Sequence, residues 1–111
     1  MTHDLEKVRL VMDEFTSFHN KATANMIALF CYIAARNDQV LETRDLPAAM
    51  HLPQTTINRL IRTMADRSYA RDEGFQLLKQ TPNPLDERQR FVELTPKGKM
   101  LAQRLKEIIN G

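Results

Sequence analysis

The sequence predicts a mainly α-helical fold that carries one β-hairpin. Two short helical segments, at residues 43–50 and 54–66, are joined by a tight break. Beyond them, residues 75–80 and 88–94 have the character of strands, and both ends of the chain carry helical apolar stripes. Two helices so connected form a helix-turn-helix, and a hairpin that follows them forms a wing. We therefore predict one winged helix-turn-helix domain of the α+β class, spanning residues 1–111.

Composition limits what such a domain can do. The 111 residues include 42% hydrophobic and 27% charged side chains, which is typical of a folded globular domain. The net charge of +2 is too small for a general nucleic-acid coat, so DNA binding would require locally clustered cations. Residues 1–7 lack a secretory signal pattern, no apolar run approaches membrane-spanning length, and Cys31 is the only cysteine. We expect a cytoplasmic protein that makes no membrane contact.

The remaining elements are expected from apolar spacing and from turn residues. An amphipathic stripe indicates a helix over about residues 3–18, and a more apolar stripe around residues 26–34 indicates a central core helix. Thr43 is a plausible N-cap for the first helix of the pair. The hairpin is expected to have a long polar tip at residues 81–87, and Thr95 followed by Pro96 is typical of a helix start.

The helix predicted at residues 54–66 has one apolar face and one polar, mostly cationic face. The N-terminal end of a recognition helix enters the major groove, where arginine can bind guanine and asparagine can bind adenine. A pair of surface arginines alone would usually be merely solvated, but the preceding helix and the basic hairpin favour DNA recognition. The predicted DNA contacts are Gln54, Thr55, Thr56, Asn58, Arg59 and Arg62 on the helix, and Lys79, Asn83, Arg88 and Arg90 on the wing at residues 79–90.

The second strand and its exit resemble a known family. Asp86-Glu87-Arg88, followed by Phe91-Val92-Glu93-Leu94-Thr95-Pro96-Lys97-Gly98, resembles the wing of MarR-type regulators, which read Asp-x-Arg, a strand, then Leu-Thr-x-x-Gly. The resemblance implies a dimeric transcriptional regulator of double-stranded DNA, most simply a repressor. It also implies that Arg88 is the wing-tip cation, set in the minor groove or on the DNA backbone, and that Asp86 orients it. Residues 52–60 are more similar to the equivalent stretch of IclR-type regulators, which are also winged helices on DNA.

The two terminal helices are expected to form a homodimer. In MarR-like proteins the terminal helices of two subunits interleave, and a small domain gains much buried surface by pairing. A two-fold dimer also suits a palindromic operator. The other interpretation is that both stripes cover only the core of their own subunit. The predicted dimer interface consists of Leu5, Val8, Met12, Phe15, Leu101, Leu105, Ile108 and Ile109.

The sequence gives no sign of catalysis, cofactor or metal binding. Its three histidines are dispersed, and it has no glycine-rich phosphate loop. Cys31 lies in an apolar run, so we predict a buried structural cysteine rather than a redox sensor. We expect a protein that is not an enzyme, and nothing in the sequence supports a small-molecule effector. Two other classes stay open: a winged helix that binds a protein, as adaptors and phage-encoded inhibitors do, and a DNA-architectural or recombination accessory factor.

Overall fold

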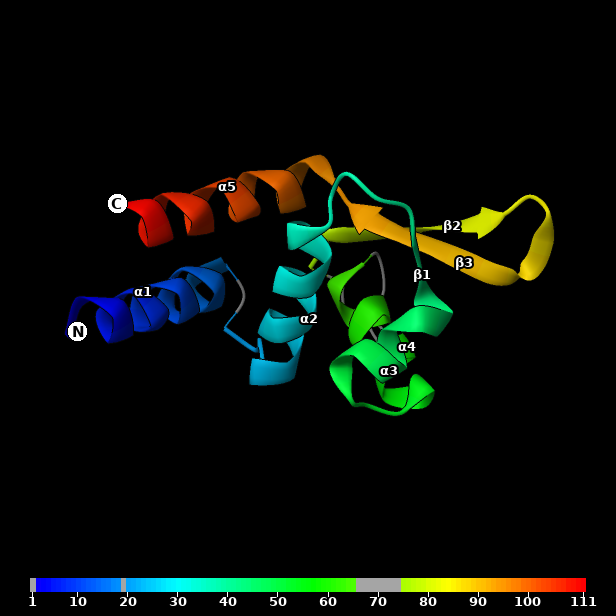
Figure 1. Ribbon diagram of the computed structural model, residues 1–111, viewed down its shortest axis with the longest axis horizontal. Coiled ribbons are helices and arrows are strands. Elements are labelled where there is room, and N and C mark those ends of the chain that lie inside the picture. The colour runs from blue at the N-terminus through cyan, green and yellow to red at the C-terminus, as the bar shows by residue number, and fades with distance from the viewer. Residues whose placement is uncertain (1, 19, 66–74) are drawn as a thin grey trace.

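The computed structural model describes residues 2–18, 20–65 and 75–111, and it shows a helical body from which a hairpin projects (Figure 1). The three strands form one antiparallel sheet in the order β1-β3-β2. The fold class predicted from the sequence is confirmed. The elements are α1 (Thr2–Phe18), α2 (Ala24–Ala35), β1 (Leu41–Glu42), the 3-10 turn η1 (Thr43–Asp45), α3 (Leu46–Met50), α4 (Gln54–Met64), β2 (Leu78–Asn83), β3 (Asp86–Leu94) and α5 (Pro96–Asn110).

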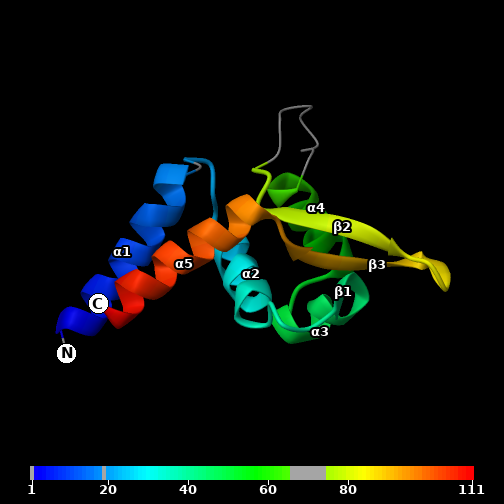
Figure 2. The same ribbon diagram turned by 90° about the horizontal axis from the view of Figure 1, so that it is seen from above.

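The first and last helices lie side by side at one end of the molecule, and the wing formed by β2 and β3 extends from the other (Figures 1 and 2). Two polar contacts join the helices. Arg104 on α5 forms an ion pair of 3.1 Å with Glu14 on α1, and the ammonium of Lys7 donates a hydrogen bond of 2.8 Å to the carbonyl of Ile109. Lys7 therefore satisfies one of the free carbonyl groups in the last turn of α5.

The core lies between these helices, α2, α4 and the sheet. Phe15 of α1 and Phe30 of α2 are fully buried, and their rings meet edge to face with centroids 5.3 Å apart. On α4 the buried side chains recur with helical spacing, as the sequence predicts, and they leave the opposite face of this helix to solvent. These four buried residues of α4 are Ile57, Leu60, Ile61 and Met64.

The break between α3 and α4 depends on one left-handed residue. His51 follows α3 with φ of 56° and ψ of 41°, a conformation that glycine adopts more readily. The next residue, Leu52, donates its backbone N–H to the carbonyl of Pro47 over 3.1 Å, which closes the last turn of α3. The predicted capping role of Thr43 is wrong: Glu42 precedes η1, and its side chain makes no capping hydrogen bond.

The first strand of the hairpin, β2, begins and ends three residues later than the sequence predicts. Residues 75–77 are not part of β2; their backbone N–H groups bind carbonyls at residues 63–65, and Gln76 has φ of 60°. β2 instead runs through Pro82, where the sequence predicts a loop. Proline is tolerated there because β2 is an edge strand, and a bulge follows at Pro82 and Asn83. The predicted seven-residue tip is therefore a short turn at Pro84 and Leu85.

The start of α5 is fixed to the chain segment that leads into β2. The hydroxyl of Thr95 accepts the backbone N–H of Gly98 at 3.0 Å, so its predicted N-cap role is confirmed. The same hydroxyl donates to the carbonyl of Gln76 at 2.6 Å, and the backbone N–H of Thr95 donates to the carbonyl of Leu77 at 3.0 Å. Gly98 is buried in this contact, where an added Cβ would lie 2.2 Å from the Leu77 oxygen.

Candidate nucleic-acid interface

The outward face of α4 carries the predicted base-reading residues. Gln54, Thr55, Asn58, Arg59 and Arg62 are all exposed, and Thr56 is half-buried. The Gln54 amide donates hydrogen bonds to the Asn58 side-chain oxygen at 2.8 Å and to the Thr43 carbonyl at 3.4 Å. These contacts pre-orient two amide side chains at the N-terminal end of α4, the end that enters a DNA groove in a helix-turn-helix.

A polar hollow of about 320 Å³ lies where α4, η1 and the wing meet. Four of its eight lining residues are arginines and none is acidic, so its surface suits an anion. Five predicted DNA contacts meet there, from two elements that are distant in sequence. The lining residues are Gln54, Asn58, Arg62, Arg88 and Arg90, which the sequence predicted, together with Thr43, Arg44 and Gln80, which it did not.

Arg44 is the one charged residue among the three lining residues that the sequence did not predict. Its guanidinium lies 2.7 Å from a carboxylate oxygen of the partly buried Glu42, and the Gln89 side-chain amide of β3 can accept from both terminal guanidinium nitrogens. These partners hold Arg44 against the wing. The sequence shows the charge of Arg44 but not its position, which depends on the pairing of β1 with β3. A strand of two residues is too short to leave a periodic pattern, so the sequence does not predict this pairing.

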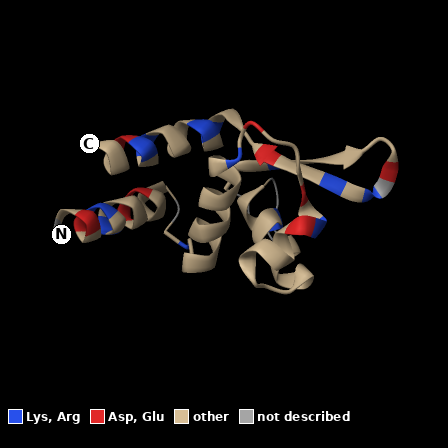
Figure 3. Cartoon of the chain, in the orientation of Figure 1, with Lys and Arg blue, Asp and Glu red and all other residues tan. Residues whose placement is uncertain are grey.

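At the wing tip, Asp86 lies beside Arg88, the residue that it is predicted to orient. One Asp86 carboxylate oxygen accepts the backbone N–H of Arg88 at 3.0 Å and lies 3.6 Å from the Arg88 guanidinium. Arg88 itself is exposed, and basic side chains follow the tip along β3 (Figure 3). Asn83 has a role inside the turn, where its side-chain oxygen accepts the backbone N–H of Leu85 at 2.9 Å.

Lys79, which the sequence predicts as a DNA contact on the wing, lies away from the wing tip. The three-residue difference in β2 places it near the base of the wing, opposite Glu93, and its ammonium forms an ion pair of 3.1 Å with that carboxylate. Glu93 neutralises much of the charge that Lys79 would offer to a phosphate. Thr55, Thr56, Arg59, Lys79 and Asn83 do not line the polar hollow.

The prediction for the terminal helices is corrected at three positions. Phe15, Leu101 and Leu105 are buried in the core of their own subunit, so they are not available to a partner. The apolar stripes continue toward the free ends of α1 and α5, where their side chains are more exposed to solvent. Met12 and Ile108 are half-buried, and Leu5, Val8 and Ile109 are exposed by 75%, 59% and 53%.

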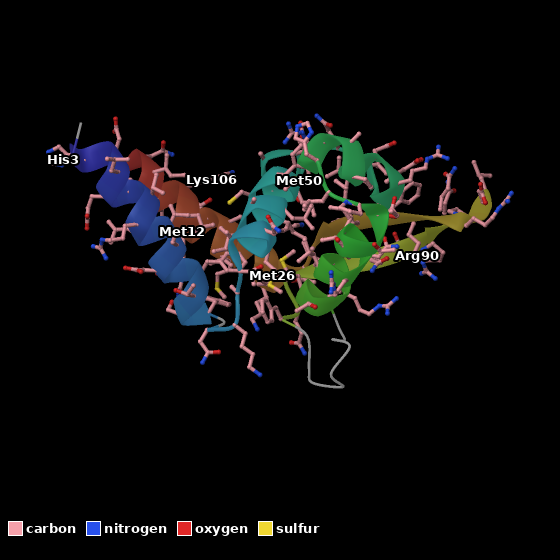
Figure 4. The ribbon with its side chains drawn as sticks, turned by 90° about the horizontal axis from the view of Figure 1, so that it is seen from below. His3, Met12, Met26, Met50, Arg90 and Lys106 are labelled. Atoms are coloured by element: carbon pink, nitrogen blue, oxygen red, sulfur yellow. The ribbon has the colours of Figure 1, made fainter. Side chains whose placement is uncertain are left out.

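A largely apolar hollow of about 360 Å³ accompanies these exposed side chains. Val8, Val11 and Met12 of α1 and Ile109 of α5 form its apolar lining, with Asp4 and Lys7 at its border. It lies at the opposite end of the molecule from the polar hollow. Figure 4 shows this separation, with Met12 on the helical pair and Arg90 on the wing side.

Cys31 is exposed, which corrects the prediction that it is buried. Partial desolvation by the neighbouring side chains nevertheless raises the pKa of its thiol, so it has little of the thiolate character of a reactive cysteine.

Within residues 2–18, 20–65 and 75–111, no three His, Cys, Asp or Glu side chains gather as metal ligands; His19 lies outside these ranges. No helix in this part of the chain is long and apolar enough to cross a membrane.

No protein-family model and no curated protein matches the chain, but several solved structures do. MepR from Staphylococcus aureus in complex with DNA is 18% identical with a TM-score of 0.75, over 95% of this chain and 77% of that one. A mutant of MarR from E. coli in complex with operator DNA is 17% identical with a TM-score of 0.67, over 97% and 69%. The heme sensor PefR from Streptococcus agalactiae, in complex with heme, is 15% identical with a TM-score of 0.67, over 99% and 76%.

This likeness covers nearly the whole chain, including the terminal helices and the wing. At identities of 15% to 18% it establishes the fold, in agreement with the resemblance that the segment from Asp86 to Gly98 carries. The chain therefore has the winged helix-turn-helix fold of MarR-type regulators.

Proposed function

We propose that the protein is a sequence-specific double-stranded DNA-binding transcriptional regulator that acts as a repressor. The observation that carries the proposal is the polar hollow, where four arginines from η1, α4 and β3 surround a space without an acidic lining residue. Guanidinium groups bind phosphate oxygens and guanine edges through paired hydrogen bonds. A duplex backbone following this hollow would meet cations from both the helix-turn-helix and the wing.

Duplex DNA accounts for the arrangement better than a protein partner does. The exposed face of α4 is polar rather than apolar, and the N-terminal Gln54 and Asn58 side chains offer the amide groups that read adenine. A protein-binding groove would instead present apolar anchors at its centre. The solved complexes of MepR with DNA and of MarR with operator DNA support the same use of this fold.

We further propose that the protein acts as a homodimer joined through the free ends of α1 and α5. Leu5, Val8 and Ile109 would be covered by the second subunit, whose own copies of these residues would fill the apolar hollow. The two recognition helices of such a dimer would read the two halves of a palindromic operator. We propose a binding activity and no catalytic one.

Fluorescence anisotropy with labelled duplexes tests the proposal. The probes are fragments flanking the protein's own gene and shuffled duplexes of the same composition, each titrated over a series of salt concentrations. We expect tighter binding to one flanking fragment and a linear fall of log affinity with log salt, because each phosphate contact releases counterions. A folded protein that bound no duplex at low salt would refute the proposal.

A matched pair of variants localises the contact. Arg90→Ala removes a cation that lines the polar hollow, and Lys106→Ala removes one on α5, at the other end of the molecule (Figure 4). We expect Arg90→Ala to lower the salt slope by about one unit and Lys106→Ala to leave it unchanged. Equal effects of the two variants would show a general attraction of DNA to a basic protein and would contradict the proposed interface.

A further inference from the structure

A large apolar side chain stands in solvent at the far end of the wing. Leu85 is 94% exposed, more than any other large hydrophobic residue of the described chain. It follows Pro84 in the short turn between β2 and β3, a position where small polar residues and glycine are usual. Single exposed leucines are common on protein surfaces. This one lies at the tip of an element that projects from the body (Figures 1 and 2).

The turn holds Leu85 in place from both sides. The Asn83 side chain accepts the backbone N–H of Leu85 at 2.9 Å, and the proline ring fixes the preceding φ angle. Beyond the turn, the Asp86 carboxylate accepts the backbone N–H of Arg88 at 3.0 Å. Because the backbone of this turn is already ordered, a contact through Leu85 would cost less conformational entropy than one through a mobile loop.

The charges around the tip indicate the chemistry of that contact. Arg88 follows Leu85 by three residues, and Arg90 lines the polar hollow farther along β3. These cations favour an anionic partner, but a leucine gains nothing from phosphate oxygens. The walls of the DNA minor groove combine both features, because apolar deoxyribose faces line the groove between two rows of phosphates. Leucine and proline are among the apolar residues that proteins insert between base steps from the minor groove.

We propose that Leu85 is a DNA contact of the wing, entering the minor groove ahead of Arg88 and packing against its deoxyribose walls. The inference rests on the proposed function. The two residues contribute differently to binding. Arg88 is attracted by the negative potential of the groove, and Leu85 stabilises the complex because its apolar surface is removed from water.

The salt dependence of binding distinguishes these two contributions. We expect Leu85→Ala to weaken binding to the preferred duplex roughly five- to tenfold, as partial burial of the three lost carbon atoms implies. The slope of log affinity against log salt should not change, because an apolar contact displaces no counterions. Arg88→Ala should reduce this slope by about one unit. Leu85→Met, which keeps an apolar side chain of similar volume, should bind within twofold of the wild type.

Val40→Ala is the matched control. Val40 is also apolar and is 74% exposed, but it lies before β1 and does not line the polar hollow. Its truncation should leave DNA affinity unchanged. On a duplex with an A·T-rich flank, saturation with netropsin, which occupies the minor groove, should also abolish the difference between Leu85→Ala and wild type.

Two results would overturn the inference while the proposed function stands. The first is wild-type affinity in Leu85→Ala, which would leave the exposed leucine to a protein partner or to no partner. The second is a loss of affinity accompanied by a lower salt slope, which would mean that the truncation had displaced the nearby arginines. Failure of the wild-type protein to bind any duplex would overturn the proposed function itself. Thermal melting of each variant confirms that the turn substitutions leave the fold intact.

Discussion

Gly98→Ala should destabilise the protein, because the structure leaves no room for a methyl group at this position. The added Cβ would lie 2.2 Å from the carbonyl oxygen of Leu77 and 3.1 Å from its carbonyl carbon. Carbon and oxygen atoms of this kind normally stay about 3.3 Å apart or more, so the two backbone segments must separate by about 1 Å. Both segments are held by hydrogen bonds through Thr95, so neither can move freely.

The size of the effect follows from two opposing contributions. Overpacking of a buried contact costs about 1–3 kcal/mol. Replacing glycine by alanine in the middle of a helix gains up to about 1 kcal/mol, but Gly98 lies in the first turn of α5, where the gain is smaller. The steric cost therefore dominates, and we expect a net loss of about 1–2 kcal/mol in the free energy of unfolding. For a domain of this size the melting temperature should fall by roughly 4–8 °C.

Thermal unfolding followed by circular dichroism measures this shift, and urea unfolding gives the free energy directly. Lys99→Ala is the control: Lys99 is the next residue of the same helical turn and is exposed, so its change should stay within about 0.5 kcal/mol. A melting temperature of Gly98→Ala at or above the wild-type value would show that α5 can move away from Leu77 without cost. That result would refute the close approach as the reason for glycine.

Three further predictions concern the surfaces described above. Light scattering should give the wild-type protein twice the chain mass of 12.9 kDa and give Val8→Glu the single mass, because a charge would enter the apolar interface; a monomeric wild type would contradict the dimer. Arg59→Ala should lose about 1–3 kcal/mol of binding free energy on the preferred duplex and much less on shuffled DNA. Lys79→Ala should lower the slope of log affinity against log salt by less than one unit, because Glu93 already pairs with its ammonium. Anisotropy titrations measure both effects. Alkylation of Cys31 at pH 7 should be slower than that of free cysteine, because its raised pKa lowers the thiolate fraction, and faster alkylation would indicate an activated thiol.

The sequence predicted α4 well because one strong pattern controls it. Four apolar residues recur at helical spacing, and the core covers that face, so both the element and its exposed face follow from periodicity. The start of α5 at Thr95 and Pro96 was predicted equally well, because it depends on local geometry alone. The threonine hydroxyl accepts a free backbone N–H of the first turn, and the φ angle of proline suits the first helical position.

The wing could not be placed by the same reasoning. Pro82 reads as a loop residue in a local pattern, yet an edge strand accepts it, and only the sheet order decides between these two outcomes. The three-residue difference moved Lys79 to the base of the wing and turned a long tip into a short turn. Leu85 lies within the predicted tip as well, but only the structure shows that its side chain is 94% exposed in a two-residue turn.

Tertiary packing also divided the apolar stripe of α1. Val8 and Phe15 are seven residues apart and lie on the same side of the helix, so the sequence treats them alike. In the structure Phe15 meets Phe30 of α2, whereas Val8 lies beyond the reach of the core and is exposed. A stripe longer than the core beneath it is therefore the feature that indicates a partner, and only its outer part can belong to an interface.

The contact at Gly98 links the two ends of the molecule. α5 carries part of the proposed dimer surface, and its first turn binds residues 76 and 77 immediately before β2 begins. The direction of α5 therefore sets the direction of the wing's base. In a two-fold dimer, the angle at which two copies of α5 meet would fix the distance between the two wings and the two copies of α4. A palindromic site requires a defined spacing between its half-sites, and the close backbone contact that glycine allows at residue 98 would help to fix this spacing in the proposed dimer.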